Sequence, residues 1–273
     1  MEITSFSNPR IKQLRKLQDK KERASSGLYY IEGLRIMGDA VQHKADFESV
    51  YYAPELLRSE FGLELVLQLE AQGIPTFNVP AEIFKHFALK DHPQGIAAVM
   101  KMCTNPLPEV DPSKRQVWVG LDAVADPGNL GTIFRTQDAT SGSGLFLLGN
   151  CVDPYDSSVV RGSMGAFYTQ PFNAMNLDEF ASWKQKNQVM VVGTSDAAAV
   201  DYQSIQYPSQ MVLLMGSERE GLHPEYVSLC DALVSIPMSG YSDSLNLSIA
   251  TAVVLYEIFN QHRRSGLVSG EKK

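Results

Sequence analysis

The sequence predicts an α/β protein made of two successive α/β units, the second with a mainly parallel sheet. Three observations support this. Short apolar runs alternate with helical patterns through most of the 273 residues. The runs of the second half are apolar throughout, as expected for parallel strands buried on both faces. Between the halves, Pro106, Pro108 and Pro112 lie in a stretch with few large apolar residues, the composition of a stiff linker.

The first half begins with a helix and continues as a small α/β domain. Asn8 and Pro9 precede Ile11, Leu14 and Leu17, which predicts a capped amphipathic helix with proline at its first position. Strands are expected at 28–31, 49–52, 76–79 and 96–100, and helices near 34–42, 54–71 and 81–89.

The second half repeats the alternation. Strands are expected at 117–121, 145–148, 189–192, 211–215 and 232–236. The last helix shows the clearest pattern, because apolar residues from Leu245 to Phe259 recur at helical spacing. We therefore predict a first domain at 1–102, a linker at 103–115, a second domain at 116–264 and a flexible tail at 265–273.

Composition narrows the class of protein. Apolar residues make up 44% and charged residues 20%, which excludes disordered and collagen-like chains. No apolar run approaches the roughly 18 residues of a membrane span, and the amino terminus has no signal-peptide pattern. Cys103, Cys151 and Cys230 are isolated, and no His or Cys motif has metal-binding spacing. We expect a cytoplasmic protein with no membrane segment and no bound metal.

The charge is unevenly distributed. The formal net charge is −7, yet the first 23 residues hold seven basic and three acidic residues and are therefore +4. The basic residues are Arg10, Lys12, Arg15, Lys16, Lys20, Lys21 and Arg23. Taken alone, this stretch is either a solvated helix or a local contact for a polyanion.

Three loops could carry chemistry, because ligands of open α/β sheets bind beyond the carboxyl ends of the strands. The first, 126–131, leads into a helix that contains Arg135, and the second, 216–221, follows the strand 211–215. The third joins 236–238 to 244–248. Each alone could be an ordinary turn or helix cap.

The joint order of these residues resembles the SpoU branch of the SPOUT RNA methyltransferases. Asn129 and Arg135, the Gly-Ser-Glu of 216–218, the Ile-Pro-Met of 236–238 and the Ser-Leu-Asn of 244–246 match the three family motifs. Arg161, Ser163 and Gly165 resemble the segment between the first two motifs. The resemblance spans about 117–259.

The first half resembles a module found before the catalytic domain of ribosomal RNA 2′-O-ribose methyltransferases. The segments Tyr-Ile-Glu-Gly at 30–33 and Pro-Gln-Gly-Ile-Ala at 93–97 carry this similarity. The module is similar to the ribosomal protein L30e fold and binds substrate RNA.

The resemblance implies methyl transfer from S-adenosylmethionine to a ribose 2′-hydroxyl, with ribosomal RNA of the large subunit as the expected substrate. It implies a SPOUT α/β-knot, in which a mainly parallel sheet with flanking helices contains a trefoil knot, and a homodimer. Transfer RNA is the alternative substrate, and a non-catalytic RNA-binding dimer is the alternative function. An unrelated nucleotide-binding protein is disfavoured because no phosphate-loop or dinucleotide glycine pattern is present.

Residue roles follow from the same resemblance. Arg135 is expected to orient a phosphate and the hydroxyl rather than act as a base, because arginine stays protonated in proteins. The other expected catalytic residues are Asn129, Glu218, Ser244 and Asn246. The expected S-adenosylmethionine contacts are Gly216, Ile236, Leu245, Thr194 and Met238. The expected RNA contacts are Arg10, Lys12, Arg15, Lys16, Lys20 and Lys21.

Overall fold

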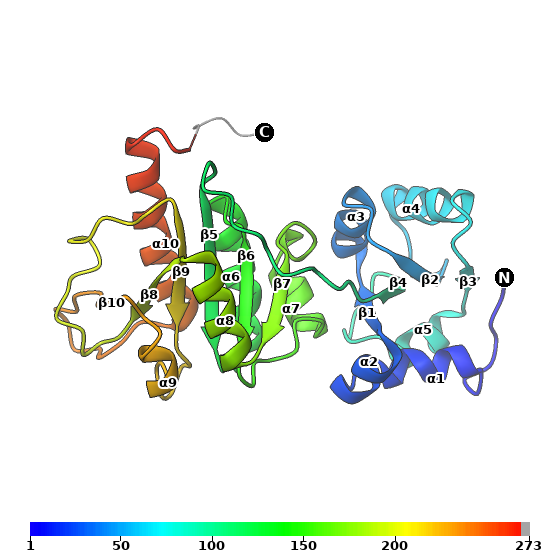
Figure 1. Cartoon of the computed structure of the whole chain (residues 1–273). Helices are drawn as coiled ribbons and strands as arrows, with labels where there is room; N and C mark the ends of the chain where they lie inside the picture. Colours follow the sequence, from blue (N-terminus) through cyan, green and yellow to red (C-terminus); the bar gives the residue numbers. More distant parts are fainter. Residues whose placement is uncertain (269–273) are drawn as a thin grey trace. The chain divides into compact units, whose positions relative to one another are not determined.

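The computed structural model describes residues 1–268, and these form two compact units. The first comprises Met1–Cys103 and Asp153–Tyr168, and the second comprises Thr104–Val152 together with 169–268 (Figure 1). The segment 153–168 therefore belongs to the first unit, although it falls inside the range 116–264 predicted from the sequence for the second domain. The chain passes from one unit to the other three times.

The first unit contains a four-stranded mixed sheet in the order β1-β4-β2-β3. β4 is antiparallel to β1 and β2, and β2 is parallel to β3. Its elements are α1 (Pro9–Lys16), α2 (Lys20–Ser26), β1 (Leu28–Glu32), α3 (Leu34–Gln42), β2 (Phe47–Tyr52), α4 (Glu60–Ala71), β3 (Thr76–Asn78), α5 (Ala81–Phe87), β4 (Ile96–Lys101) and, from the later segment, α7 (Ser157–Gly162) and a short 3-10 helix (Ala166–Tyr168).

Local signals at the helix ends explain where these helices begin. Asn8 Oδ1 accepts a hydrogen bond from the Arg10 amide at 2.9 Å, which confirms the predicted cap of α1. Asp19 caps a separate helix, α2, so the basic stretch forms two helices. The helix predicted over 54–71 begins only at Glu60, because the Ser59 side chain caps α4 there.

Arg23 is the one basic residue of the first 23 that the structure buries, with 4% of its surface exposed. Its Nε donates to Asp153 Oδ2 at 2.7 Å, and its Nη1 donates to the carbonyls of Leu17 and Gln18 at 2.9 Å. Asp153 is also buried and begins the segment 153–168. The ion pair of Arg23 with Asp153 therefore links α2 to that segment, and Arg23 contributes no exposed charge.

The second unit contains a six-stranded parallel sheet in the order β10-β8-β9-β5-β6-β7 (Figure 1). Its elements are β5 (Gln116–Asp122), α6 (Pro127–Ala139), β6 (Gly144–Leu148), β7 (Phe172–Met175), α8 (Leu177–Asn187), β8 (Met190–Thr194), β9 (Gln210–Met215), α9 (Pro224–Val227), β10 (Ala232–Val234) and α10 (Leu247–Arg264). This parallel sheet confirms the α/β class predicted for this half.

Helices cover both faces of this sheet. On one face, the rings of Trp118 and Phe146 pack against Trp183 of α8, with ring centroids 5.3 and 4.7 Å apart. On the other, α6 and α10 pack against each other and bury apolar side chains such as Phe134 and Leu255. The sheet is therefore buried on both sides, which explains the apolar runs of its central strands.

The sequence pattern did not predict β7, which pairs in parallel with β6 at the edge of the sheet. β7 is short and contains the polar Asn173, whose Nδ2 donates to the Asn105 carbonyl at 2.8 Å. The Trp183 indole similarly donates to the Pro108 carbonyl at 2.9 Å. Residues of the predicted linker 103–115 are thus bound to the second unit by specific hydrogen bonds.

The Arg23 contact gives a stability prediction. Arg23→Met should lower the free energy of unfolding by about 3–5 kcal/mol, because it leaves the buried Asp153 carboxylate unpaired. Lys21→Met, an exposed position on the same helix, should change it by no more than about 0.5 kcal/mol. Urea unfolding of the full chain measures both, and equal midpoints would show that the pair contributes nothing.

Candidate active site

The loops that follow β5 and β9 meet at one edge of the parallel sheet. The two strands are neighbours, with Leu121 paired to Met215. After β5 the chain continues to β6 and β7 on one side, whereas β8 and β10 lie beyond β9 on the other. The strand order reverses between β5 and β9, and such a reversal is where ligands bind in open α/β sheets.

Three of the predicted site residues form one hydrogen-bonded chain at this edge. Asn129 Nδ2 donates to Glu218 Oε1 at 2.8 Å, and Asn246 Nδ2 donates to Asn129 Oδ1 at 3.0 Å. Asn129 is 7% exposed, so both ends of its amide are paired in a buried position. The structure therefore joins the three motifs, which are far apart in sequence, through two side-chain amides.

Helix ends position two of these side chains. Asp126 caps α6, because its carboxylate accepts a hydrogen bond from the backbone amide of Asn129 at 2.7 Å. Pro127 occupies the first helical position. Asn246 caps α10, because its Oδ1 accepts from the Ser248 amide at 3.0 Å while its Nδ2 remains available for Asn129. The same asparagine therefore starts a helix and links two loops.

The loop that carries Glu218 folds back on itself. The Ser217 and Gly221 backbones exchange two hydrogen bonds of 2.9 and 3.1 Å. A side chain at position 216 would overlap the peptide between Gly221 and Leu222. Glycine is thus required at 216 by the loop's own backbone, a reason that adds to the close approach of a ligand expected from the sequence.

An aspartate–histidine pair at the same edge was not found from the sequence. The side chain of Asp122, the last residue of β5, is 1% exposed, and its Oδ2 accepts from the His223 backbone amide at 2.9 Å and pairs with His223 Nδ1 at 2.8 Å. The other ring nitrogen lies 3.3 Å from Glu220 Oε2. The hydrogen bond and charge of Asp122 raise the pKa of His223 above its ordinary value.

The available sequence signal for this pair was weak. An aspartate at the end of a buried strand and a histidine just after a glycine-bounded loop occupy the two neighbouring strand exits. Only the pairing of β5 with β9 shows that these exits meet. Asp122 closes the base of the 216–223 loop, because it binds both the backbone and the ring of its last residue.

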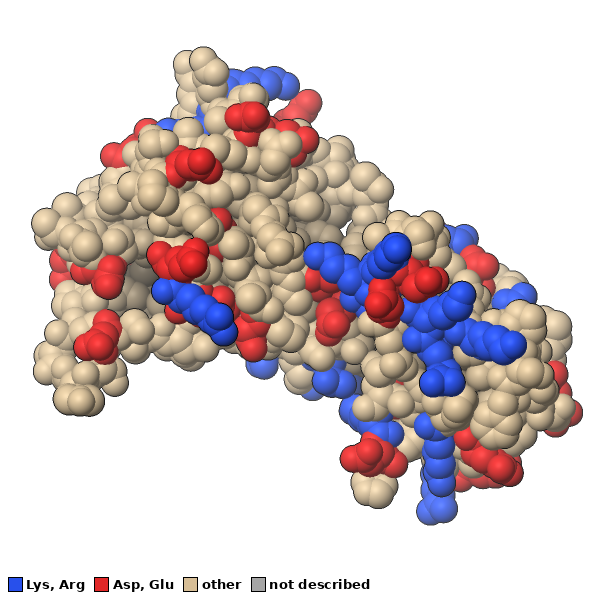
Figure 2. Space-filling view, turned by 90° about the horizontal axis from the view of Figure 1, so that it is seen from below, with Lys and Arg blue, Asp and Glu red and all other residues tan. Residues whose placement is uncertain are grey.

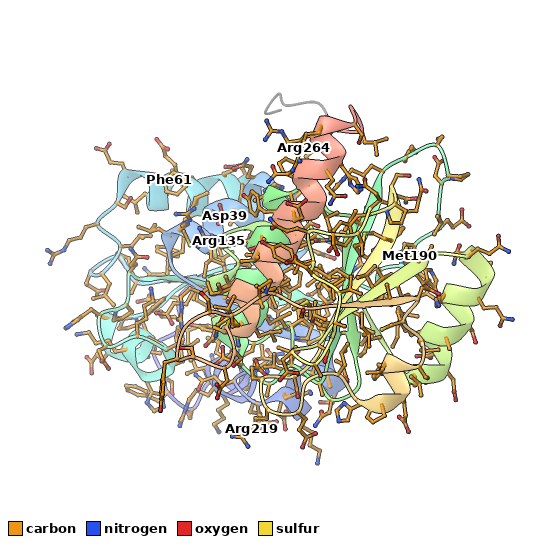
Figure 3. The ribbon with its side chains drawn as sticks, turned by 90° about the vertical axis from the view of Figure 1, so that its left-hand side faces the viewer. Asp39, Phe61, Arg135, Met190, Arg219 and Arg264 are labelled. Carbon is orange, nitrogen blue, oxygen red and sulfur yellow. The ribbon has the colours of Figure 1, made fainter. Side chains whose placement is uncertain are left out.

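Arg135 and Ser244 lie outside the hydrogen-bonded chain. Both are exposed, and within residues 1–268 no acidic side chain forms an ion pair with Arg135. Arg135 is on α6, which packs beside α10 (Figure 3). It follows Asn129 by six residues, a rotation of roughly 600°, so the two side chains point about 120° apart. Within residues 1–268, no hydrogen bond joins Asn129 to Arg135.

The residues expected to contact S-adenosylmethionine follow three neighbouring strands. Thr194 ends β8, Gly216 follows β9, and Ile236 lies two residues after β10, and these strands are adjacent in the order β10-β8-β9. Met238 and Leu245 are 40% and 36% exposed. Backbone at a strand exit together with exposed apolar side chains fits an adenosine and a thioether chain, so the residues present are compatible with this ligand.

The six residues expected to contact RNA are all exposed and lie on α1 and α2. Figure 2 looks onto the side of α1 and α2 and shows lysine and arginine gathered over this part of the first unit. Arg15, Lys16, Gln18, Asp19, Lys21 and Glu22 line an open depression of about 550 Å³, named here the basic groove. Three of the six predicted contacts, Arg15, Lys16 and Lys21, thus line one depression.

Comparison with known proteins identifies the family. The SpoU rRNA Methylase family matches residues 116–256, and the MRM3-like substrate binding domain matches residues 8–98. The chain belongs to the SpoU rRNA methylase family. This match confirms the family resemblance, the fold class and the enzyme class expected from the sequence.

Individual relatives agree along nearly the whole chain. The structure is similar to that of an S-adenosylmethionine-bound rRNA methyltransferase from Sinorhizobium meliloti, with a TM-score of 0.86 and 35% identity over 98% of this chain and 99% of that one. A 23S rRNA (guanosine(2553)-2′-O)-methyltransferase of Bacillus subtilis is 27% identical over 94% of this chain and 98% of its own. A 23S rRNA (uridine(2479)-2′-O)-methyltransferase of Streptomyces viridochromogenes is 28% identical over 90% of this chain and 87% of its own.

Residues 1–268 contain no group of three or more His, Cys, Asp or Glu side chains arranged to hold a metal ion. No helix in that range has the length and apolar character needed to cross a membrane.

The double role of Asn246 can be separated by mutation. Asn246→Asp keeps an oxygen to cap α10 but loses the amide hydrogen given to Asn129, so stability should stay near wild type while methyl transfer falls. Asn246→Ala loses the cap as well and should cost about 0.5–2 kcal/mol of unfolding free energy. Urea unfolding and a methylation assay measure the two effects. Full activity of Asn246→Asp would remove the amide link from the mechanism.

The His223 pair predicts a pH dependence. Because the folded-state pKa is raised, the pair's contribution is complete below the unfolded value of about 6.5 and is lost as pH rises through the folded value. The difference in unfolding free energy between wild type and His223→Gln should therefore be largest in mild acid and shrink towards alkaline pH. A difference that does not vary between pH 5 and 9 would contradict a protonated His223 facing Asp122 and Glu220.

Proposed function

We propose that this chain transfers a methyl group from S-adenosylmethionine to a ribose 2′-hydroxyl of large-subunit ribosomal RNA. The observation that carries the proposal is the chain of hydrogen bonds from Asn246 through Asn129 to Glu218, which gathers the three family motifs at the reversal of strand order. The relatives named above for 23S rRNA support the substrate class.

Arg135 orients the acceptor in this proposal. Its exposed guanidinium can bind a phosphate next to the target ribose through two parallel hydrogen bonds. Ser244, also exposed, offers a hydroxyl near the start of α10, where helix amides favour an anion. Proton removal passes to phosphate or water, because the guanidinium stays protonated.

The methyl donor is held at the exits of β8, β9 and β10. Thr194, Gly216 and Ile236 lie there, with Met238 and Leu245 as exposed apolar contacts. When bound, S-adenosylmethionine supplies an electrophilic methyl group on a cationic sulfur. The protein's contribution is positioning, which can lower a barrier by roughly 7–11 kcal/mol. The S-adenosylmethionine-bound structure of the Sinorhizobium relative supports this choice of donor.

The two named relatives modify different nucleotides. One acts on a guanosine and another on a uridine, at different positions of 23S rRNA. The family match and the two 23S rRNA methyltransferases support an enzyme over a non-catalytic RNA-binding dimer, and ribosomal RNA over transfer RNA. The domain at 8–98 matches a substrate-binding domain, and the 23S rRNA methyltransferases named above align with 94% and 90% of this chain, so the alignments include that domain.

A homodimer is part of the proposal. Ile249 and Tyr256 are 50% and 44% exposed and lie two turns apart on α10, so they present apolar surface on one side of that helix. A second copy of the chain would bury this surface. A monomeric mass by light scattering at micromolar concentration would contradict the dimer. The trefoil knot and the cytoplasmic location remain predictions, the second from the wide spacing of the three cysteines in the sequence.

Mapping of 2′-O-methylation in cells tests the proposed function. Removing the protein should abolish one methylated site in 23S rRNA, and restoring the wild-type chain should return it. Arg135→Ala should bind S-adenosylmethionine normally but lower the methylation rate by about 100-fold or more. Arg264→Ala is the control, because this exposed arginine lies at the other end of α10 from Asn246 (Figure 3). An unchanged methylation map would refute the proposal.

A further inference from the structure

We propose that Phe6 and His86 form a platform on which an unpaired RNA base stacks, next to the basic groove. The inference rests on the proposed function, since it assumes that this surface meets RNA. It gives Phe6 and His86 a role in binding. Neither the sequence motifs nor the charge pattern had assigned them one. The recognised chemistry is the flat π face of a nucleobase in single-stranded RNA.

Phe6 has the exposure needed for such a contact. It lies in the turn before α1, and 47% of its surface is exposed. Its ring packs edge to face on the His86 ring, with centroids 5.1 Å apart and an interplanar angle of 87°. The two rings therefore support each other from different elements, because His86 belongs to α5.

Arg15 joins this platform to the basic groove. Its Nη1 lies 3.0 Å from His86 Nε2, and since the guanidinium can only donate, Nε2 accepts. Arg15 also lines the groove with Lys16 and Lys21. A strand whose phosphates follow the groove would thus bring a base next to Phe6.

The acidic side chains in the basic groove do not cancel its positive charge. Asp19 and Glu22 line it as well. The Asp19 carboxylate accepts the Lys21 amide at 2.7 Å as the cap of α2, so the helix amino terminus offsets part of its charge. The basic residues Lys16 and Lys21 have no such cap and remain exposed.

The charged residues around Phe6 favour an RNA base over a protein segment as the ligand of the platform. Phe61 on α4 (Figure 3) is a similarly exposed phenylalanine of the same unit, with 50% of its surface exposed. Its neighbours on the helix include Glu60 and Glu64. Phe6 instead lies close in sequence to Arg10 and Lys12 and contacts a histidine bound to arginine. An aromatic surface beside a basic groove suits single-stranded RNA, because its bases can stack on the rings while its phosphates contact the basic side chains.

The test compares full-length variants with two probes, a fluorescein-labelled single-stranded 12-mer of oligoadenylate and a 12-base-pair RNA duplex. Point variants are used because Ile11, Leu14 and Leu17 of the amino-terminal segment belong to the core, so its deletion would damage the fold. Phe6→Ala should weaken single-strand binding by about 5- to 150-fold, the equivalent of about 1–3 kcal/mol per stacked base, and duplex binding by less than about 2-fold.

Two further variants separate stacking from charge. Phe6→Trp should retain single-strand affinity, and His86→Gln, which keeps an acceptor for Arg15 but removes the ring, should weaken it. Phe6→Ala should leave the slope of log affinity against log salt unchanged. Lys16→Gln should reduce the magnitude of that slope by about 0.7, the contribution of one phosphate contact on a single strand. Phe61→Ala is the matched control and should have no effect on either probe.

The outcomes distinguish the platform from the proposed function. If Phe6→Ala and His86→Gln bind both probes as wild type does while Lys16→Gln changes the salt slope, the platform is wrong and RNA contact at the groove stands. If Phe6→Ala weakens both probes equally, base stacking is refuted. If no variant changes binding, this surface does not meet RNA, whereas methylation of 23S rRNA by the same variants still reports the enzyme's activity. Thermal unfolding of each variant confirms that it is folded.

Discussion

The pairing of β5 with β9 is the constraint on which the site depends. Parallel neighbours place their carboxyl ends at the same sheet edge, so the loops beginning after Asp122 and after Met215 must approach each other. The sheet then grows outward in both directions from this pair. A ligand at that edge can be contacted from the exits of several strands, while the buried sheet holds those exits in fixed register.

Side-chain amides turn this proximity into a defined arrangement. An asparagine both donates and accepts, so Asn129 can receive a hydrogen bond from Asn246 and give one to Glu218 without any change of protonation. The Asp122 carboxylate performs a similar task at the base of the loop through His223. Arg135 is outside these contacts, which leaves its charge available for substrate in the proposed mechanism.

The fold predictions succeeded for features that depend only on residues close together in the sequence. The Asn8 cap of α1 was predictable because capping needs only the side chain and the next amides. The strand β7 was missed because its alignment with β6 at the sheet edge is a long-range property of a short, partly polar segment. The placement of 153–168 with the first unit was missed for the same reason, since the Arg23–Asp153 pair joins residues 130 positions apart.

For the site, the sequence by itself determined which residue types are available and in what order, because motif spacing is a property of the chain. It identified Asn129, Glu218 and Asn246, and it located the basic surface that α1 and α2 present. Only the tertiary structure decided that these three side chains bond to one another, that Asp122 binds His223, and that Arg23 is buried while its basic neighbours remain exposed. The physical reason is that hydrogen bonds and burial depend on distances between atoms, which strand pairing sets across long stretches of sequence.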